Sequence, residues 1–240
     1  VISIVKSNYP DFGPTFACEK LVACHNKKIS RETLRTLMIT SGLWHARVKK
    51  QARIHQSRER RPRFGELCQW DGSHHDWFEG RAPKCCLLLI VDDATSKILY
   101  ARFDSSETTN GYMRCVKEHI KRYGRPLAYY NDKHSIFKTT RDQCLDGRLK
   151  DTQIYRALQE LKIEMICAHS PQAKGRVERA NGTLQDRLIK EMRLLGISSI
   201  LEANQYLETF IIAYNAQFGK EPRSPEDAHR PCHKTTEQLE

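Results

Sequence analysis

The sequence predicts an α/β fold in which one mixed, five-stranded sheet carries helices on its faces and is preceded by a small all-helical module. Two observations lead to this prediction. The run KCCLLLIVDD at 84–93 is almost continuously apolar, which is typical of a strand buried on both faces. The segments after Gly65 follow the order β-β-β-α-β-α-β-α, which passes from antiparallel pairing into βαβ units. The 240 residues are enough for such a core and a smaller module.

Five segments after Gly65 have the character of strands. Segment 98–104, ILYARFD, alternates apolar and polar residues and follows the turn ATSK, so it should pair antiparallel with 84–93. The other strands are predicted at 66–71 (ELCQWD), 126–132 (PLAYYND) and 163–169 (IEMICAH). Helices are predicted at 108–122, 152–161, 174–195 and 199–217, with a polar loop at 133–151. These elements define a core at 65–218 and a C-terminal tail at 219–240.

Residues 1–45 predict two short helices joined by a tight turn. Ser30 is a good N-cap for the second helix, and Gly42 is placed to end it. The apolar positions with helical spacing are Phe16, Ala17, Leu21 and Cys24 in the first helix and Leu34, Leu37 and Met38 in the second. The pattern indicates a helix-turn-helix, whose second helix would read the major groove, or else a helical hairpin with no role on DNA. Because the chain begins at Val1 without an initiating Met, we expect this module to be incomplete.

The positive charge is concentrated in the first quarter of the chain. The net charge is +11, and residues 1–64 hold 14 Lys and Arg against 4 Asp and Glu. A basic linker at 46–64 contributes much of this excess, which favours a polyanion as partner, and nucleic acid in particular, over a merely solvated linker. The candidate DNA contacts in this quarter are Arg31 and Arg35 on the second helix and Lys49 and Lys50 in the linker. No run of about 18 apolar residues predicts a membrane span.

The nine cysteines do not form a recognisable framework. Their number is odd, no C-x-x-C pair occurs, and most lie in apolar runs, so they are predicted to be reduced and buried. The stretch QWDGSHHDW at 69–77 contains two histidines and two carboxylates, which raises the alternative of a zinc site. No Cys pair supplies the further ligands that zinc needs. His74 and His75 are therefore expected to line a groove or to satisfy local backbone groups.

Three acids stand out by their positions. Asp71 ends the first predicted strand, Asp132 ends the fourth, and Glu178 lies in the first turns of the long helix. Carboxylates at the ends of neighbouring strands can converge, and a helix packed there can add a third. Such an all-oxygen site suits Mg²⁺ or Mn²⁺. Alternatively, each of the three acids is an ordinary turn or helix-surface residue. The nearest rival acids, Asp92 and Asp93, lie in the turn DDATSK, and we expect them to shape that turn.

The order of these acids matches that of a known family. Residues 65–218 resemble the catalytic core of DDE transposases and retroviral integrases, which have a ribonuclease-H-like fold, and the likeness is greatest to bacterial insertion-sequence transposases of the ISNCY group. The residues that carry the resemblance are WDGSHHDWFEG, LLLIVDDATSKIL, YNDKHSIF and SPQAKGRVERANGTLQDRL. Upstream, DFGPTFACEKL and SRETLRTLMITSGLW resemble the helix-turn-helix part of those proteins.

The resemblance implies roles for individual residues. Asp71, Asp132 and Glu178 would be the catalytic acids and would hold two Mg²⁺ or Mn²⁺ ions. Lys174 and Arg179 would contact DNA near the site, and Arg176 between them is a further candidate. In many members 35 residues separate the second Asp from the Glu, whereas 45 lie between Asp132 and Glu178 here. The catalytic acids can still be assigned, but the role of loop 133–151 cannot be carried over.

The implied activity is metal-dependent cleavage and strand transfer at the ends of an insertion sequence. The protein would act on element-end and target DNA as a homo-oligomer assembled on that DNA, in the bacterial cytoplasm at the nucleoid. Two alternatives remain open at this point. One is a ribonuclease-H-like nuclease that only hydrolyses, and the other is a catalytically inactive DNA-binding regulator.

Overall fold

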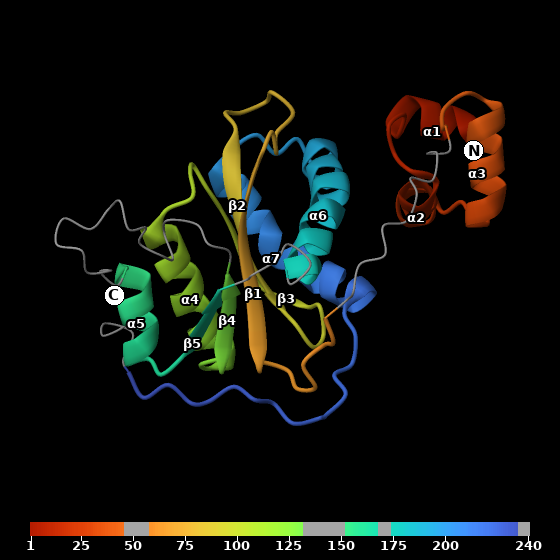
Figure 1. Cartoon of the computed structure of the whole chain (residues 1–240). Helices are drawn as coiled ribbons and strands as arrows, with labels where there is room; N and C mark the ends of the chain where they lie inside the picture. The colour runs from red at the N-terminus through yellow and green to blue at the C-terminus, as the bar shows by residue number, and fades with distance from the viewer. Residues whose placement is uncertain (46–57, 132–151, 168–173, 235–240) are drawn as a thin grey trace. The chain divides into compact units, whose positions relative to one another are not determined.

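The chain divides into two compact units, Val1–Ile54 and His55–Glu240. The computed structural model describes residues 1–45, 58–131, 152–167 and 174–234 (Figure 1). Lys49, Lys50, Asp132 and the loop 133–151 lie outside the described residues. Within the described ranges, no helix is long and apolar enough to span a bilayer.

The first unit is a cluster of three helices, α1 (Ile2–Asn8), α2 (Pro14–His25) and α3 (Arg31–Thr40). The predicted pair of helices is confirmed as α2 and α3, and α1 is an additional helix. Ser30 caps α3 as predicted, because its Oγ accepts a hydrogen bond from the Thr33 backbone N–H at 3.0 Å. The helices enclose a core of their own, built from Val5, Tyr9, Phe12, Phe16, Ala17, Cys18, Leu21, Leu34 and Met38.

Two apolar positions predicted to face this core do not. Cys24 is exposed at the last turn of α2, and Leu37 is 39% exposed on α3. The buried stripe of α3 consists of Leu34 and Met38, which are four residues apart and therefore lie on one side of the helix. Leu37 points away from this stripe, so the helix is anchored by a narrower face than the sequence pattern indicated.

The second unit contains the predicted mixed sheet. Its strands are β1 (Leu67–His75), β2 (Cys85–Asp92), β3 (Ile98–Asp104), β4 (Ala128–Asn131) and β5 (Glu164–Cys167). Their spatial order is β3-β2-β1-β4-β5. The first three strands pair antiparallel, whereas β4 is parallel to both β1 and β5. The α/β class and the element order are confirmed, and β1 is the central strand (Figure 1).

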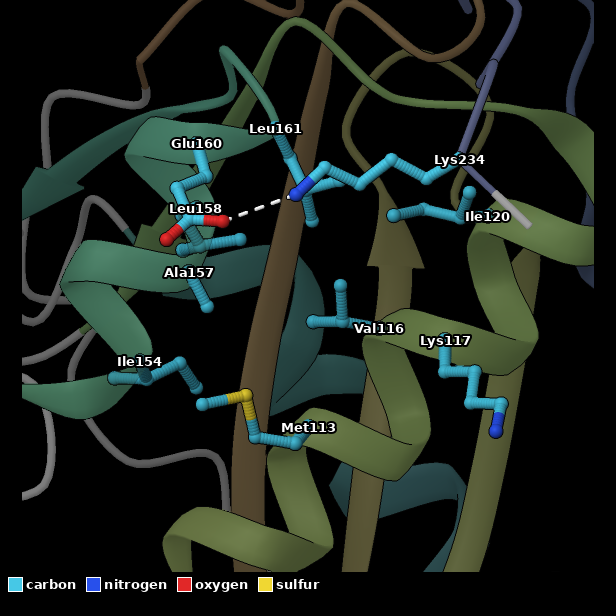
Figure 2. Close-up of a pocket in the computed structure, with 10 residues that line it drawn as sticks. All are labelled: Met113, Val116, Lys117, Ile120, Ile154, Ala157, Leu158, Glu160, Leu161 and Lys234. Carbon is cyan, nitrogen blue, oxygen red and sulfur yellow. Dashed lines mark hydrogen bonds and ion pairs between the residues drawn. The ribbon is translucent and has the colours of Figure 1, made fainter. Parts of the chain in front are cut away.

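Helices cover both faces of this sheet (Figure 1). β2 is buried along its whole length, and its side chains alternate between two cores. Leu87, Leu89 and Val91 pack with α6 (Gly175–Leu194) and α7 (Ile200–Phe218). The residues between them pack with α4 (Thr109–Tyr123) and α5 (Gln153–Glu160) on the opposite face. A small apolar pocket of about 150 Å³ lies between α4 and α5, with the Lys234–Glu160 ion pair at its edge (Figure 2).

The prediction that the first strand ends at Asp71 is wrong. β1 continues to His75, and Asp71 lies at its centre, opposite Leu89 of β2. The Asp-Gly pair does not form a turn here, because the antiparallel ladder with β2 continues through Gly72 to the pairing of His75 with Cys85. His74 and His75 are thus exposed strand residues and do not lie beyond the strand.

The segment after α7 packs against the second unit. Its backbone pairs with that of the chain before β1 and before β4, through Ala228 with Phe64 and through Arg230 with Arg125. The imidazole of His229 is 2% exposed, so residues 219–234 complete one end of the α4–α5 core.

Candidate active site

Asp71 is held against the start of α6 by two hydrogen bonds. Lys174, the N-cap residue of α6, places its ammonium 2.6 Å from Oδ1 of Asp71. Asn181, two turns further along the helix, donates from Nδ2 to the other carboxylate oxygen at 2.9 Å. The Lys174 side chain is 8% exposed and the Asp71 side chain 22%, so the ion pair is largely buried.

These contacts fix which side of α6 faces Asp71. Glu178 comes four residues after Lys174 and three before Asn181, so the three positions share one side of the helix. Since Lys174 and Asn181 both touch Asp71, the side that carries Glu178 also fronts Asp71. Glu178 itself is exposed. An exposed carboxylate on the side of α6 that faces a second, partly buried carboxylate can take part in binding a cation from solvent.

Gln69 of β1 links this strand to the start of α6 and to Asp93. Its side chain is fully buried, and its Oε1 accepts a hydrogen bond from the Val177 backbone N–H at 3.2 Å. Its Nε2 donates to Asp93 Oδ1 at 2.8 Å. Further along the same helix, Gln185 donates to the Ser73 hydroxyl at 3.1 Å. Polar contacts therefore run along β1 on both sides of Asp71 and set its position relative to Glu178.

The described part of the site contains two of the three predicted acids. Asp71 and Glu178 lie on facing elements, whereas Asp132 is outside the described residues. β4 can be followed to Asn131, which is fully buried, and its parallel register aligns Gln69 with Tyr130.

Asp92 and Asp93 have different roles, although both were predicted to shape the turn after β2. Asp92 does so: its carboxylate accepts hydrogen bonds from the Thr95 N–H and hydroxyl and from the Gly65 N–H. Burial raises the pKa of Asp92 above its ordinary value, and these hydrogen bonds oppose the shift. Asp93 instead lies under the start of α6, fully buried among cationic groups.

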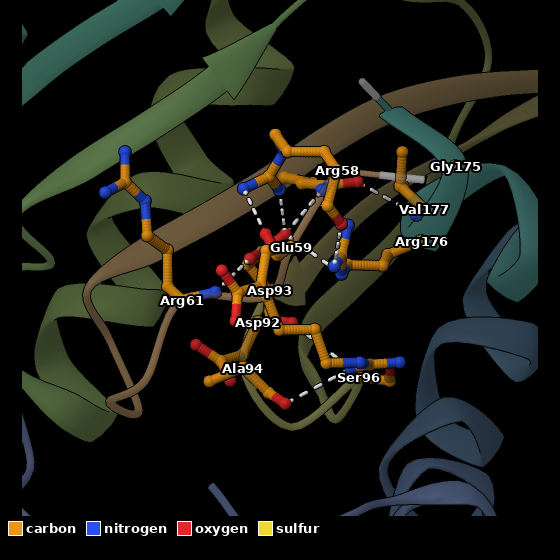
Figure 3. A network of polar contacts seen from close by, with 12 residues as sticks. Arg58, Glu59, Arg61, Asp92, Asp93, Ala94, Ser96, Gly175, Arg176 and Val177 are labelled. Atoms are coloured by element: carbon orange, nitrogen blue, oxygen red, sulfur yellow. Dashed lines mark hydrogen bonds and ion pairs between the residues drawn. The ribbon is translucent and has the colours of Figure 1, made fainter. Parts of the chain in front are cut away.

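The Asp93 network joins four segments (Figure 3). Its carboxylate contacts the Arg58 guanidinium, the Arg61 backbone N–H at 2.8 Å, Gln69 and the Arg176 Nε at 3.1 Å. Arg176 also donates to the Arg58 carbonyl at 3.0 Å. Sequence reasoning missed this network, because a DDAT sequence favours a turn and nothing in the local pattern indicates that a distant helix supplies the counter-charge.

The predicted DNA contacts occupy different environments. Arg176 is 7% exposed and is held by the Asp93 network. Arg179 is exposed, and its Nε donates to the Gly175 carbonyl at 2.8 Å. Arg31 and Arg35 are exposed on α3, where Arg35 lies 3.7 Å from Glu32.

Glu107 is a further acid near Asp71 that the sequence did not single out. Its carboxylate accepts a hydrogen bond from the Tyr112 hydroxyl at 2.6 Å and occupies the space that a side chain at position 72 would fill. His74 Nε2 lies 3.8 Å from it. The ligand atoms of His74, Cys86 and Glu107 lie within 4.8 Å of one another, so the fold brings to His74 potential metal ligands that the local sequence lacks.

A second cluster of potential ligands lies on the α4 face, away from α6. His119 Nε2 and His229 Nε2 are 3.1 Å apart, and Cys68 is close to both. The other ring nitrogens bond to the Tyr129 hydroxyl and to Asp227, each at 2.6 Å. Burial lowers the pKa of His119 to about 3, and His229 contributes in the same direction. The imidazole of His119 is therefore neutral in the folded protein at physiological pH.

Comparison with known proteins agrees with this architecture. Residues 159–218, which include α6 and α7, match the family described as the integrase core domain. The chain is 47% identical over 238 residues to a Sinorhizobium fredii protein named as a transposase, y4bF, covering 99% of this chain and 52% of that protein. The chain is a relative of bacterial transposases. It is also 38% identical over 174 residues to the transposase for insertion sequence IS1202 of Streptococcus pneumoniae, covering 71% of this chain and 37% of that protein.

The relatives are longer than this chain, which spans about half of the first and just over a third of the second. The fold is also similar to that of a chain in a viral structure. A chain of the simian T-cell lymphotropic virus intasome, solved with PP2A regulatory subunit B56 gamma, superposes with a TM-score of 0.55 at 17% identity. The match covers 90% of this chain and 79% of that one. The integrase-type fold predicted from the sequence is confirmed.

Proposed function

We propose that the chain is the DNA-cleaving and strand-transferring part of a transposase that acts at the ends of an insertion sequence. The observation that carries this proposal is the double contact of Asp71 with α6. Lys174 and Asn181 hold the carboxylate from both sides, and Glu178 lies between them on the same side of the helix. Two acids on facing elements suit the metal-dependent transfer of a phosphoryl group in DNA. The named relatives support the same activity.

The donor set fits a hard divalent cation. Asp71, Asp132 and Glu178 would hold two Mg²⁺ or Mn²⁺ ions, because these metals prefer carboxylate oxygens and water. The Lys174 ammonium already provides a positive charge at Asp71 Oδ1, so this carboxylate is built to face a cation. The register that aligns Gln69 with Tyr130 supports placing Asp132 beside Asp71. When bound, the ions would activate the attacking oxygen and stabilise the leaving oxygen of the phosphodiester.

The chain's own residues prepare the site for this chemistry. Asn181 orients one oxygen of Asp71, and Gln69 fixes the helix end that carries Lys174 and Glu178. Lys174 would exchange its contact with Asp71 for a phosphate oxygen of the bound DNA, as a single point of charge. In the first unit, α2 and α3 would form the helix-turn-helix, and α3, with Arg31 and Arg35, would read the major groove of the element end. The basic linker with Lys49 and Lys50 would follow the DNA backbone. Homo-oligomers would assemble on that DNA, at the bacterial nucleoid.

The test is a cleavage and strand-transfer assay on duplexes that carry the inverted repeats flanking the gene. With Mg²⁺, the full chain should nick these ends and join them to target DNA. Asp71→Asn, Asp132→Asn and Glu178→Gln should each abolish both products while DNA binding persists, because a hard cation tolerates the loss of an anionic ligand poorly. Asp186→Asn is the matched control: this acid lies on α6 but pairs with Lys190 at the surface.

Each outcome decides between the possible functions. Cleavage without joining would indicate a nuclease that only hydrolyses, and binding without either product would indicate an inactive regulator. Near-normal Mg²⁺-dependent cleavage by any one of the three variants would show that its acid is misassigned.

A further inference from the structure

A strongly basic hollow of about 500 Å³ opens beside the start of α6, and we call it the basic cleft. Three segments far apart in the sequence supply its cations. The chain before β1 contributes Arg58, Arg60 and Arg61, and α6 contributes Arg176 and Arg179. The segment after α7 contributes Lys220 and Arg223. Among the described residues, two acids, Glu59 and Glu221, line the same hollow, so the cations outnumber the acids there.

Part of this charge is neutralised within the fold. Arg58 and Arg176 converge on the buried carboxylate of Asp93 (Figure 3). Arg223 pairs with Glu59 at 2.5 Å. These arginines hold the walls together, since each joins two segments that are distant in the sequence. Asp93 neutralises Arg58 and Arg176 within the fold, whereas Arg223 forms a surface pair in which its side chain is 58% exposed.

Arg61 lies 3.7 Å from Glu66. The other three cations have no acidic partner among the described residues: Arg60, Arg179 and Lys220. Arg60 is nevertheless held in place, because its guanidinium donates to the Asp93 and Ala94 carbonyls at 3.2 and 3.1 Å and to the Ser96 hydroxyl at 2.8 Å. Arg179 is steadied by the Gly175 carbonyl. Neutral acceptors thus orient these guanidinium groups without cancelling their charge, which is the condition for binding an anion from solution.

The cations of the basic cleft also repel one another. Burial lowers the pKa of Arg176, Asp93 opposes that shift, and the neighbouring charges of Arg58, Arg60 and Arg179 lower it further. An anion bound among these groups would relieve the repulsion. Because the hollow is open and polar, an extended polyanion fits it better than an enclosed small molecule.

We propose that the basic cleft binds the sugar–phosphate backbone of DNA through Arg60, Arg179 and Lys220, beside the reacting phosphodiester and separate from it. This inference rests on the proposed function, which makes DNA the partner. Arg179 follows Glu178 directly and is rotated from it by about 100° around the helix. A strand that reaches the acids can therefore continue over the edge of α6 into the basic cleft. Contacts of this kind position DNA without reading its sequence.

The test measures binding of a fluorescent duplex of unrelated sequence to the full chain over a range of salt concentrations. The triple variant Arg60→Gln/Arg179→Gln/Lys220→Gln should bind more weakly. Its slope of log affinity against log salt should be shallower by about 2–3, since each lost phosphate contact removes about 0.9. The matched control, Arg114→Gln/Lys121→Gln/Lys162→Gln, removes the same charge from exposed residues on the α4–α5 side and should keep the parental slope.

A salt slope of the triple variant equal to that of the parent or the control would overturn the proposal. If loss of the three Arg60 contacts unfolds the triple variant, Arg179→Gln and Lys220→Gln singly should each reduce the slope by about 0.9. The two proposals fail separately. A parent that cannot cleave end DNA but shows the slope change would refute the transposase chemistry alone, whereas an active parent with no slope change would refute the basic cleft alone.

Discussion

Replacing Asp93 with Asn should both destabilise the second unit and impair its chemistry. The substitution keeps the shape of the side chain but removes the negative charge that faces Arg58 and Arg176. Arg176 is 7% exposed, so its guanidinium would remain buried without a counter-ion. Breaking a buried ion pair from one side typically costs about 3–5 kcal/mol. For a unit of this size each kcal/mol lowers Tm by about 2–4 °C, so Tm should fall by about 6–20 °C.

The same substitution should also slow DNA cleavage at temperatures at which the variant is still folded. Asp93 orients Gln69, and Gln69 in turn binds the Val177 N–H at the start of α6. A looser contact there would let Lys174 and Glu178 shift relative to Asp71. A displacement of about 1 Å can reduce a rate by about 100-fold. We therefore expect a loss of at least tenfold in the rate of end cleavage at temperatures where the variant is folded.

Thermal unfolding followed by circular dichroism, together with the cleavage assay, checks both effects. Asp186→Asn is the surface control, since its pair with Lys190 is half-exposed and should contribute less than about 1 kcal/mol. The double variant Asp93→Asn/Arg176→Met should recover part of the lost stability, because the more deeply buried of the two guanidinium groups is then absent. If Asp93→Asn has the same Tm as Asp186→Asn, the Asp93 network does not stabilise the fold and the prediction is wrong.

Three further changes have defined outcomes. Lys174→Ala should raise the activation free energy of end cleavage by about 1–3 kcal/mol, because a charge-assisted contact is lost. It should also lower the Mg²⁺ concentration that gives the half-maximal rate, because no ammonium then competes for Asp71. Unchanged values in the cleavage assay would show that Lys174 does not contribute to the reaction. The depressed pKa of His119 means that its stabilising effect is present above pH 6.5 and is lost as the pH falls toward 3. The free energy of unfolding, measured by urea titration, should therefore fall by about 2 kcal/mol between pH 7 and pH 5, and by less in His119→Gln. The same pH dependence in the parent and the variant would contradict this. Ser30→Ala should destabilise α3 by about 1 kcal/mol in the same titrations, and no change would show that this cap is dispensable.

The pattern of residues by itself determined the class and the order of the elements. A short apolar run such as 84–93 predicts a strand buried on both faces, and the structure places this strand beside the central strand β1. Helix starts were predictable where a local hydrogen bond decides them, as at Ser30. The candidate acids Asp71 and Glu178 could be selected because motif spacing reflects a chemistry that needs several carboxylates.

Only the tertiary structure decided which partners each side chain has. The Asp-Gly pair at Asp71 is a turn signal, yet pairing with β2 overrides it, because a continuous ladder satisfies more backbone groups than a turn would. Asp93 is one residue of a turn motif by sequence, and it becomes the buried counter-charge for Arg58 and Arg176 because segments more than 30 residues away fold over it. Such pairings depend on distances between elements, which local periodicity does not encode. The basic cleft is a product of the same folding, since three segments distant in the sequence supply its cations.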